Sequence, residues 1–170
     1  MVPEELLLYL KEKKPKVSGL EKSVDLLYLF LIIYQFILIY LNYRDLPEII
    51  PTHYNLQGEP DGYGGKGILF IFPVISVFLF FIFSLAKRFP QFLNVPWQLT
   101  KENLLRQIDH VQKFLMILKG ILLLMLTLFC VQSIEIAKGT EQNLGLLLPF
   151  HFLALMALIA WYFIRGYRLR

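Results

Sequence analysis

Four long apolar segments alternate with polar stretches along the chain. They cover residues 24–42, 68–86, 114–136 and 144–164. Each has close to the about 20 residues that a helix needs to cross the hydrocarbon core of a bilayer. Because backbone groups in hydrocarbon must bond within their own segment, we expect every span to be helical. The pattern predicts an all-α integral membrane protein, a bundle of four transmembrane helices that forms one membrane domain over residues 1–170.

The polar stretches predict the orientation of the spans. Lys and Arg are frequent in residues 1–23, 87–113 and 165–170 and scarce in the loops 43–67 and 137–143. Basic residues next to membrane spans stay preferentially in the cytoplasm. We therefore expect both termini and the 87–113 connection to be cytoplasmic. The loops 43–67 and 137–143 are then extracytoplasmic.

Composition supports the membrane class and narrows the partners. Hydrophobic residues make up 56% of the 170 residues and charged residues 18%, with a mean hydropathy of +0.56. The net charge of +4 comes from basic residues that bracket the spans and form no patch of their own. We therefore expect the lipid bilayer, and not nucleic acid, as a partner of this chain. Whether the chain also forms a homo-oligomer stays open from the sequence. The single Cys130 lies in an apolar run and is interpreted as a small buried hydrophobe.

Two cytoplasmic pieces have helical patterns. Residues 3–10 have acids first and lysines after them, which predicts a short helix on the inner membrane surface. Thr100 predicts a cap for a helix that begins at Lys101 and continues into the third span. In that helix we expect Lys119 to extend to the inner interface and His110 to lie on a solvated face.

The loop 43–67 is dense in turn-forming residues. Pro47 and Pro51 favour extended backbone before them, and Thr52–Leu56 alternates as a short strand would. Asp61 and Gly62 form a strong turn signal. We therefore predict a structured cap between the first two spans, a hairpin-like ribbon and not a flexible linker.

The same loop carries a family resemblance. From Leu46 to Lys66 it reads Leu-Pro-x-x-Ile-Pro-Thr-His-Tyr-Asn-x-x-Gly-x-Pro-Asp-Gly-x-Gly-x-Lys. This resembles the signature of a bacterial membrane family with a domain of unknown function, which also forms the N-terminal part of the SdpI-like immunity proteins of the Sdp toxin system. Residues 92–96 and 100–103 are similar to the segment that follows in many stand-alone members. The resemblance implies a bacterial inner-membrane protein of largely uncharacterised activity, although this sequence shows no counterpart of the longer C-terminal membrane region of SdpI.

Candidate ligand-binding residues lie in the cap and in the outer half of the spans. Polar groups at membrane depth are costly and usually face the bundle interior, often for function. The candidate residues, together with Tyr34, Gln35 and Ser133, predict a polar pocket beneath the cap. The alternative is structural: His53 and Asp61 bond to loop backbone, and Lys66 pairs with Asp61 or Glu59. The candidates are His53, Asn55, Gly58, Asp61, Gly62, Lys66, Gln132, Glu135 and His151.

A divalent metal is the one cofactor that these residue types suggest. His53, Asp61, Glu135 and His151 offer imidazole and carboxylate ligands. No second His follows at i+4 and no Cys pair is present, so the spacing matches no standard metal site. We therefore expect no cofactor, with a metal bound by these four residues as the alternative.

Three functions stay open from the sequence. The first is recognition of an extracytoplasmic peptide or envelope ligand, immunity- or signalling-like by resemblance and without catalysis. The second is a small membrane enzyme or metal-binding protein that uses the outer polar pocket; its catalytic residues are not identified by any motif. The third is a transporter subunit, although no paired Gly/Pro-broken helices are seen. The lack of a catalytic signature ranks recognition first.

Overall fold

The computed structural model describes Leu6, residues 19–89 and residues 95–170, with the side chains of Lys87 and Arg88 left aside. Four helical stretches are long and apolar enough to cross a membrane, as predicted. A two-stranded antiparallel hairpin lies between the first two, where the cap was expected. The elements in chain order are α2 (Gly19–Asn42), β1 (Ile49–Tyr54), β2 (Pro60–Gly65), the 3₁₀ helix η1 (Lys66–Phe70), α3 (Ile71–Arg88), α4 (Leu104–Lys138) and α5 (Leu147–Arg168).

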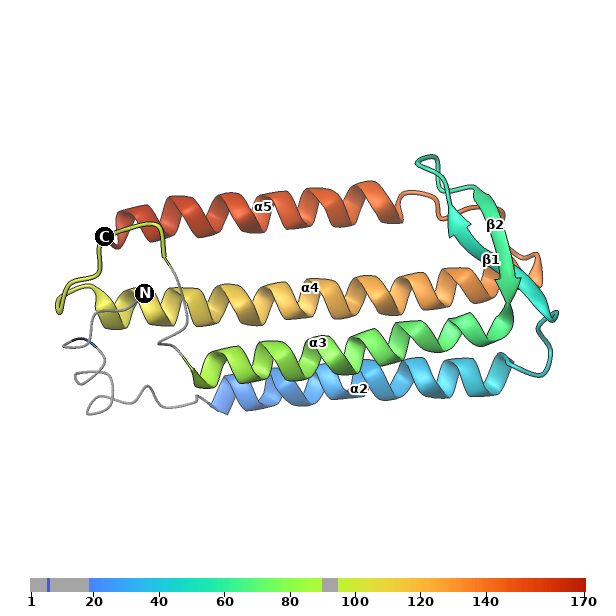
Figure 1. Ribbon diagram of the computed structural model, residues 1–170, viewed down its shortest axis with the longest axis horizontal. Helices are drawn as coiled ribbons and strands as arrows, with labels where there is room; N and C mark the ends of the chain where they lie inside the picture. The colour runs from blue at the N-terminus through green and yellow to red at the C-terminus, as the bar shows by residue number, and fades with distance from the viewer. Residues whose placement is uncertain (1–5, 7–18, 90–94) are drawn as a thin grey trace.

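The four long helices run side by side, and the hairpin lies across one end of them (Figure 1). We call this the hairpin end, and the opposite end, where α5 finishes, the C-terminal end. The helix α4 is the centre of the packing, because α2, α3 and α5 all contact it. The helices α2 and α3 also pack on each other, whereas α5 packs mainly on α4. The helices α2, α3 and α5 thus surround α4.

The helix boundaries follow local sequence signals. Pro73 and Pro149 each lie at the third residue of their helices α3 and α5, where a missing N–H does least harm. The helix α4 ends at Gly139, whose φ of 78° is a left-handed conformation that glycine adopts without strain. The N–H groups of Gly139 and Thr140 then bond to carbonyls of the last helical turn.

The beginning of α4 differs from the prediction. Residues 101–103 form a turn, and the helix begins at Leu104 instead of Lys101. The side chains of Thr100 and Asn103 explain the shift, because each accepts a hydrogen bond from the backbone N–H of the other, at 2.9 and 3.3 Å. The long helix that runs into the third span is otherwise as expected. The predicted interfacial helix at residues 3–10 lies outside the described residues except for Leu6, which is buried against Leu104 and Ile108.

Two polar residues of α4 do not lie where the sequence analysis put them. Lys119 is fully buried, so the prediction that it extends to the interface is wrong. His110 is 1% exposed, so its predicted solvated position is wrong as well. Its Nε2 donates to the carbonyl of Tyr162 at 2.9 Å, and the two rings stack. Both side chains face neighbouring helices because α4 has packing partners on several sides.

The core at the hairpin end joins the hairpin to the helices. Residues from α2, β1, η1 and α4 meet there, and Cys130 is fully buried among them, as expected for a small hydrophobe. Burial of apolar side chains at about 25 cal/mol per Å² is the general reason that such a cluster holds its parts together. The cluster consists of Ile39, Leu46, Ile50, Leu69, Cys130 and Ile134.

Candidate functional site

The hairpin loop is built around the side chain of Asn55. Its Oδ1 accepts hydrogen bonds from the N–H groups of Gln57 and Glu59, at 2.9 and 3.0 Å. Its Nδ2 donates to Glu59 at 3.2 Å, and its own N–H bonds to the Glu59 carbonyl. Asparagine commonly closes turns in this way. The role of Asn55 in this structure is therefore to shape the loop.

Two glycines of the hairpin stand where a side chain would not fit. Gly58 has φ of 80°, and its carbonyl accepts the N–H of Leu144 at 2.9 Å, which ties the hairpin to the α4–α5 loop. Gly62 lies opposite His53, and a Cβ at this position would come within 2.9 Å of the His53 Cβ. Both candidates are thus required for backbone geometry.

Lys66 anchors the base of the hairpin to the segment that follows α2. Its Nζ donates to the Leu46 carbonyl at 3.1 Å, lies 3.1 Å from a carboxylate oxygen of Glu48 and sits 4.8 Å from the centre of the Tyr43 ring. The residue is only 9% exposed. The sequence predicted, as the structural interpretation, that Lys66 forms an ion pair with Asp61 or Glu59. The partner is Glu48, because the strand register places Lys66 beside the start of β1.

His53 and Asp61 form the exposed part of the hairpin. His53 Nδ1 lies 2.5 Å from Asp61 Oδ1, and the two side chains are 74% and 42% exposed. Ile49 and Tyr63 on the same hairpin are 62% and 65% exposed. The structural alternative had expected these two residues to bond to backbone; they bond instead to each other. A hydrogen-bonded imidazole and carboxylate are therefore presented to the surroundings on the same hairpin as two exposed large side chains.

The candidates in the outer halves of α4 and α5 bond locally. His151 Nδ1 donates to the Leu147 carbonyl one turn earlier in its own helix, at 2.6 Å. Glu135 accepts from Thr140 at 2.7 Å and from Lys138 at 3.3 Å. Gln132 Nε2 donates to the Asn143 carbonyl at 3.1 Å. Each of these groups serves the end of α4 or the beginning of α5.

These positions do not gather a metal site. Within the described ranges, no three His, Cys, Asp or Glu side chains come close enough together to hold a metal ion. His53 and Asp61 form a pair, whereas Glu135 and His151 bond to their own helices and their ends. The structure thus brings together two of the four metal candidates and not the other two.

The polar groups deeper in the bundle form a separate network. Gln35 is fully buried; its Nε2 donates to Thr127 Oγ1 at 2.8 Å, and its Oε1 accepts from Ser76 at 3.1 Å. Thr127 in turn donates to the Leu123 carbonyl. The network joins α2, α3 and α4. Tyr34, by contrast, is 47% exposed on the outside of α2.

Ser133 lies beneath the hairpin near Tyr54. Ser133 is buried, and burial raises the pKa of the Tyr54 phenol while its interaction with Ser133 opposes that rise. The predicted pocket beneath the cap is therefore divided: Gln35 lies in one network, Ser133 in another, and Gln132, Glu135 and His151 at the helix ends.

Sequence reasoning missed two polar groups in the half of the bundle towards the C-terminal end. Lys119 pairs with Asp25 at 2.6 Å and donates to Ser84 at 3.2 Å, so α2, α3 and α4 each contribute one group. Gln107 donates to the Gly166 carbonyl and accepts from the Trp97 indole, both at 2.9 Å. The sequence did contain a signal for the Lys119–Asp25 pair. Asp25 lies at the start of one apolar span and Lys119 within another, and opposite charges in apolar spans indicate a pair in the bundle interior.

Comparison with known proteins gives a family for part of the chain. Residues 30–77 match the model of a family described as Domain of unknown function (DUF1648). The matched residues include most of α2, the hairpin, η1 and the start of α3, and therefore His53, Asp61 and Lys66. They make up less than a third of the chain.

One curated protein is similar to part of the chain. An uncharacterized protein of Archaeoglobus fulgidus is 39% identical over 64 residues, which are 33% of this chain and 35% of that protein. The chain therefore spans about a third of the length of the relative it matches. No solved structure matches the chain. Four candidate spans and a domain of unknown function together indicate a multi-pass membrane protein.

Proposed function

We propose that this protein recognises an extracytoplasmic peptide or envelope component through the exposed side of its hairpin. The observation that carries the proposal is the His53–Asp61 pair, held 2.5 Å apart and exposed beside Tyr63. Exposed polar and aromatic groups on a rigid support are typical of binding surfaces. The support here is rigid because Asn55 closes the loop, Lys66 ties the hairpin to the segment after α2, and Gly58 ties it to the α4–α5 loop.

The proposal includes the location and orientation of the chain. We place it in the cytoplasmic membrane, the inner membrane of a bacterial source, with both termini in the cytoplasm and the hairpin outside. The support is the alternation of basic flanks. The resemblance to SdpI-like proteins suggests an immunity- or signalling-like role, and so makes a peptide toxin the first ligand to test.

Orientation is tested by labelling single cysteines in intact cells. The background is Cys130→Ala, since Cys130 is buried. A membrane-impermeant maleimide is expected to modify Leu56→Cys at the hairpin tip, where Leu56 is 95% exposed, and not Lys101→Cys near the start of α4. Labelling of Lys101→Cys alone would overturn the proposed orientation.

Recognition is tested with the protein in lipid nanodiscs and purified Sdp toxin peptide. The peptide is expected to bind filled nanodiscs and not empty ones. His53→Ala is expected to weaken binding about tenfold, the loss of one good polar contact. The matched control is Lys138→Ala, an exposed residue outside the hairpin. Equal binding to filled and empty nanodiscs would contradict the immunity-like role, and unchanged affinity of His53→Ala would exclude the hairpin surface.

A second candidate function, a small membrane enzyme, is favoured by the same pair. A carboxylate that bonds to one nitrogen of an imidazole orients the other nitrogen for proton transfer. Here His53 would be the general base and Asp61 the residue that positions it. Turnover of an envelope extract by the nanodisc protein, lost in His53→Gln and reduced in Asp61→Asn, would support this function; product formation by His53→Gln at the normal rate would exclude it.

A further inference from the structure

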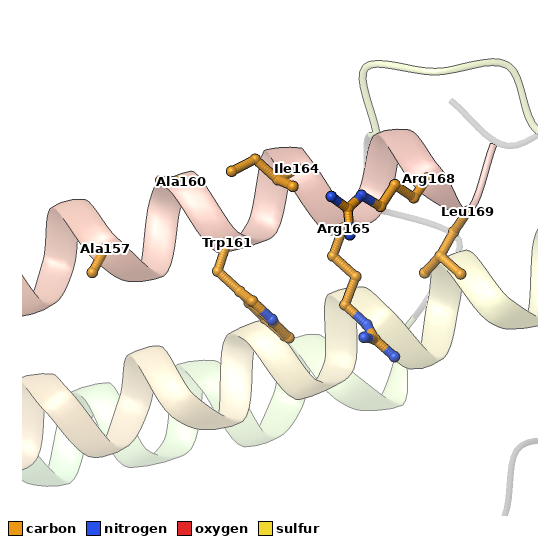
Figure 2. A pocket seen from close by; sticks show the side chains of 7 residues that line it. All are labelled: Ala157, Ala160, Trp161, Ile164, Arg165, Arg168 and Leu169. Atoms are coloured by element: carbon orange, nitrogen blue, oxygen red, sulfur yellow. The ribbon is translucent and has the colours of Figure 1, made fainter.

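A groove of about 490 Å³ runs along α5 towards the C-terminal end of the bundle (Figure 2). One part of its lining is apolar: Ala157, Ala160 and Ile164. The other part carries Trp161, Arg165 and Arg168. From Ala157 to Arg168 the helix rises roughly 16 Å, at 1.5 Å per residue. That length is close to one leaflet, half of the about 30 Å hydrocarbon core.

The surroundings of α5 leave the groove open to the bilayer. In the most apolar stretch of α5, only 6% of the residues are buried inside the protein. The corresponding shares for the other three spans are 17%, 17% and 28%. The helix packs mainly on α4, so most of its surface must contact lipid or another protein. Because Ala157 and Ala160 line this groove, it leaves room for an acyl chain that larger side chains would exclude.

Trp161 is held in place at the polar end of the groove. Its ring lies 4.8 Å from the His110 ring of α4, and His110 is itself bonded to the Tyr162 carbonyl. Figure 2 shows Trp161 and Arg165 extending from the same side of α5. The indole N–H of Trp161 makes no hydrogen bond to any other described residue. Tryptophan at a membrane interface offers this group to headgroup oxygens.

The two arginines have no acidic partner within the described part of the chain. Arg165 and Arg168 are exposed and lie three residues apart, neighbours on the helix surface. In Figure 2 the Arg165 side chain extends towards α4, and the Arg168 side chain lies along α5. Cations in a last helical turn favour the helix dipole, and basic residues also fix topology. The helix dipole and the topology signal explain two basic residues in the last turn. They do not explain why a groove and an indole N–H donor lie beside these residues. Guanidinium groups bind phosphate through paired N–H donors.

We propose that this groove binds an anionic phospholipid. The phosphodiester lies between Arg165 and Arg168 with the Trp161 N–H as a third donor, and one acyl chain follows Ala160 and Ala157. The lipid belongs to the leaflet that the C-terminal end of the bundle faces, which is the cytoplasmic one in the proposed orientation. Basic pockets beside transmembrane helices commonly select such headgroups. The proposal is independent of the role of the hairpin.

The test is lipid retention by the full chain, measured by native mass spectrometry after release from nanodiscs of phosphatidylcholine with phosphatidylglycerol. Phosphatidylglycerol is expected to be retained in preference to phosphatidylcholine. Arg165→Gln/Arg168→Gln is expected to lower that retention about 25-fold, roughly fivefold for each arginine. The matched control is Lys101→Gln/Arg106→Gln, which removes two exposed basic residues at the start of α4 and is expected to retain the lipid.

A second variant separates the lipid from other occupants. Ala160→Leu fills the apolar part without changing charge and is expected to reduce retention, because the acyl chain loses its place. If inorganic phosphate displaces the bound species and Ala160→Leu has no effect, the groove binds a free anion and the lipid proposal fails. It fails too if Arg165→Gln/Arg168→Gln converts a dimer to a monomer, because the occupant is then a second copy. Equal retention in Arg165→Gln/Arg168→Gln and the control variant would overturn it outright.

Discussion

Lys119 Nζ lies 2.6 Å from Asp25 Oδ1 and thereby joins α4 to α2. Lys119 is fully buried, while the Asp25 side chain is 31% exposed. The ammonium also donates to Ser84 on α3 and lies over the Phe80 ring, 4.5 Å from its centre. Hydrogen bonds, an opposite charge and an aromatic face thus compensate for the loss of water around the lysine. This cluster sets the relative positions of three helices.

We predict that Asp25→Leu destabilises the protein more than Lys119→Met. The first change leaves a buried ammonium without its counter-charge, whereas the second leaves a carboxylate that water partly reaches. Breaking a fully buried pair costs roughly 3–5 kcal/mol. Because Asp25 is partly exposed, we expect the free energy of unfolding to fall by about 1–3 kcal/mol for Asp25→Leu. Unfolding in bicelles by steric trapping measures it.

Two further variants complete this test. The double variant Asp25→Leu/Lys119→Met is expected to recover part of the stability, since no unpaired charge then remains. Asp109→Asn breaks the exposed Asp109–Lys113 pair and is expected to change stability by less than about 0.5 kcal/mol. If Asp25→Leu behaved like Asp109→Asn, the pair would have no part in holding the helices.

The elements of this fold could be predicted because their signals are local. The length and composition of each apolar segment determine the spans, and the prolines favour extended backbone before Lys66. The turn predicted at Asp61 and Gly62 is wrong, because both residues lie in β2 and the chain reverses at residues 55–59, where Asn55 closes the loop. The partners of Lys66 could not be predicted in the same way. They depend on the strand register, in which Ile49 pairs with Gly65 and brings Lys66 to Glu48.

The candidates for the predicted outer pocket lie apart for a different physical reason. Counting residues gives the depth of a side chain in the membrane but not the neighbour it faces. His151 bonds to the Leu147 carbonyl of its own helix, and Glu135 bonds to Thr140 beyond the end of α4. Local partners therefore satisfy groups that depth alone suggested as a shared site. The pairing of His53 with Asp61 likewise required the geometry of the hairpin.

Gln35→Leu is expected to weaken the packing of α2 on α3 and α4. It removes the hydrogen bonds with Thr127 and Ser76 in the membrane interior. At about 0.6 kcal/mol for each interhelical bond, the free energy of unfolding should fall by about 1 kcal/mol. The control Tyr34→Phe removes only an exposed hydroxyl on the neighbouring residue and should change nothing. Equal stabilities of these two variants in the bicelle unfolding assay would refute the network.

Gly166→Ala is expected to displace the Trp97 indole. A Cβ at Gly166 would clash with the Trp97 ring, which is held there by its bond to Gln107. Overpacking of this kind costs roughly 1–3 kcal/mol. In a Trp161→Phe background, the fluorescence of Trp97 should shift to longer wavelength as the ring becomes more exposed. Gly65→Ala, with φ of −63° and open space around its Cβ, is the control and should leave the spectrum unchanged; a Gly166→Ala spectrum equal to that of the control would contradict the contact.

Asn55→Ala is expected to loosen the hairpin loop without unfolding the helices. The change removes the acceptor that the N–H groups of Gln57 and Glu59 share. Losing a comparable capping side chain costs about 1 kcal/mol, so the exchange of these two amide hydrogens should become about fivefold to tenfold faster. Leu56→Ala, at the 95% exposed tip, is expected to leave their exchange unchanged. If the two amides exchanged at the same rate in both variants, the loop would be held by its backbone hydrogen bonds alone. The presence of Asn55 in the signature would then have to be explained by binding instead of by folding.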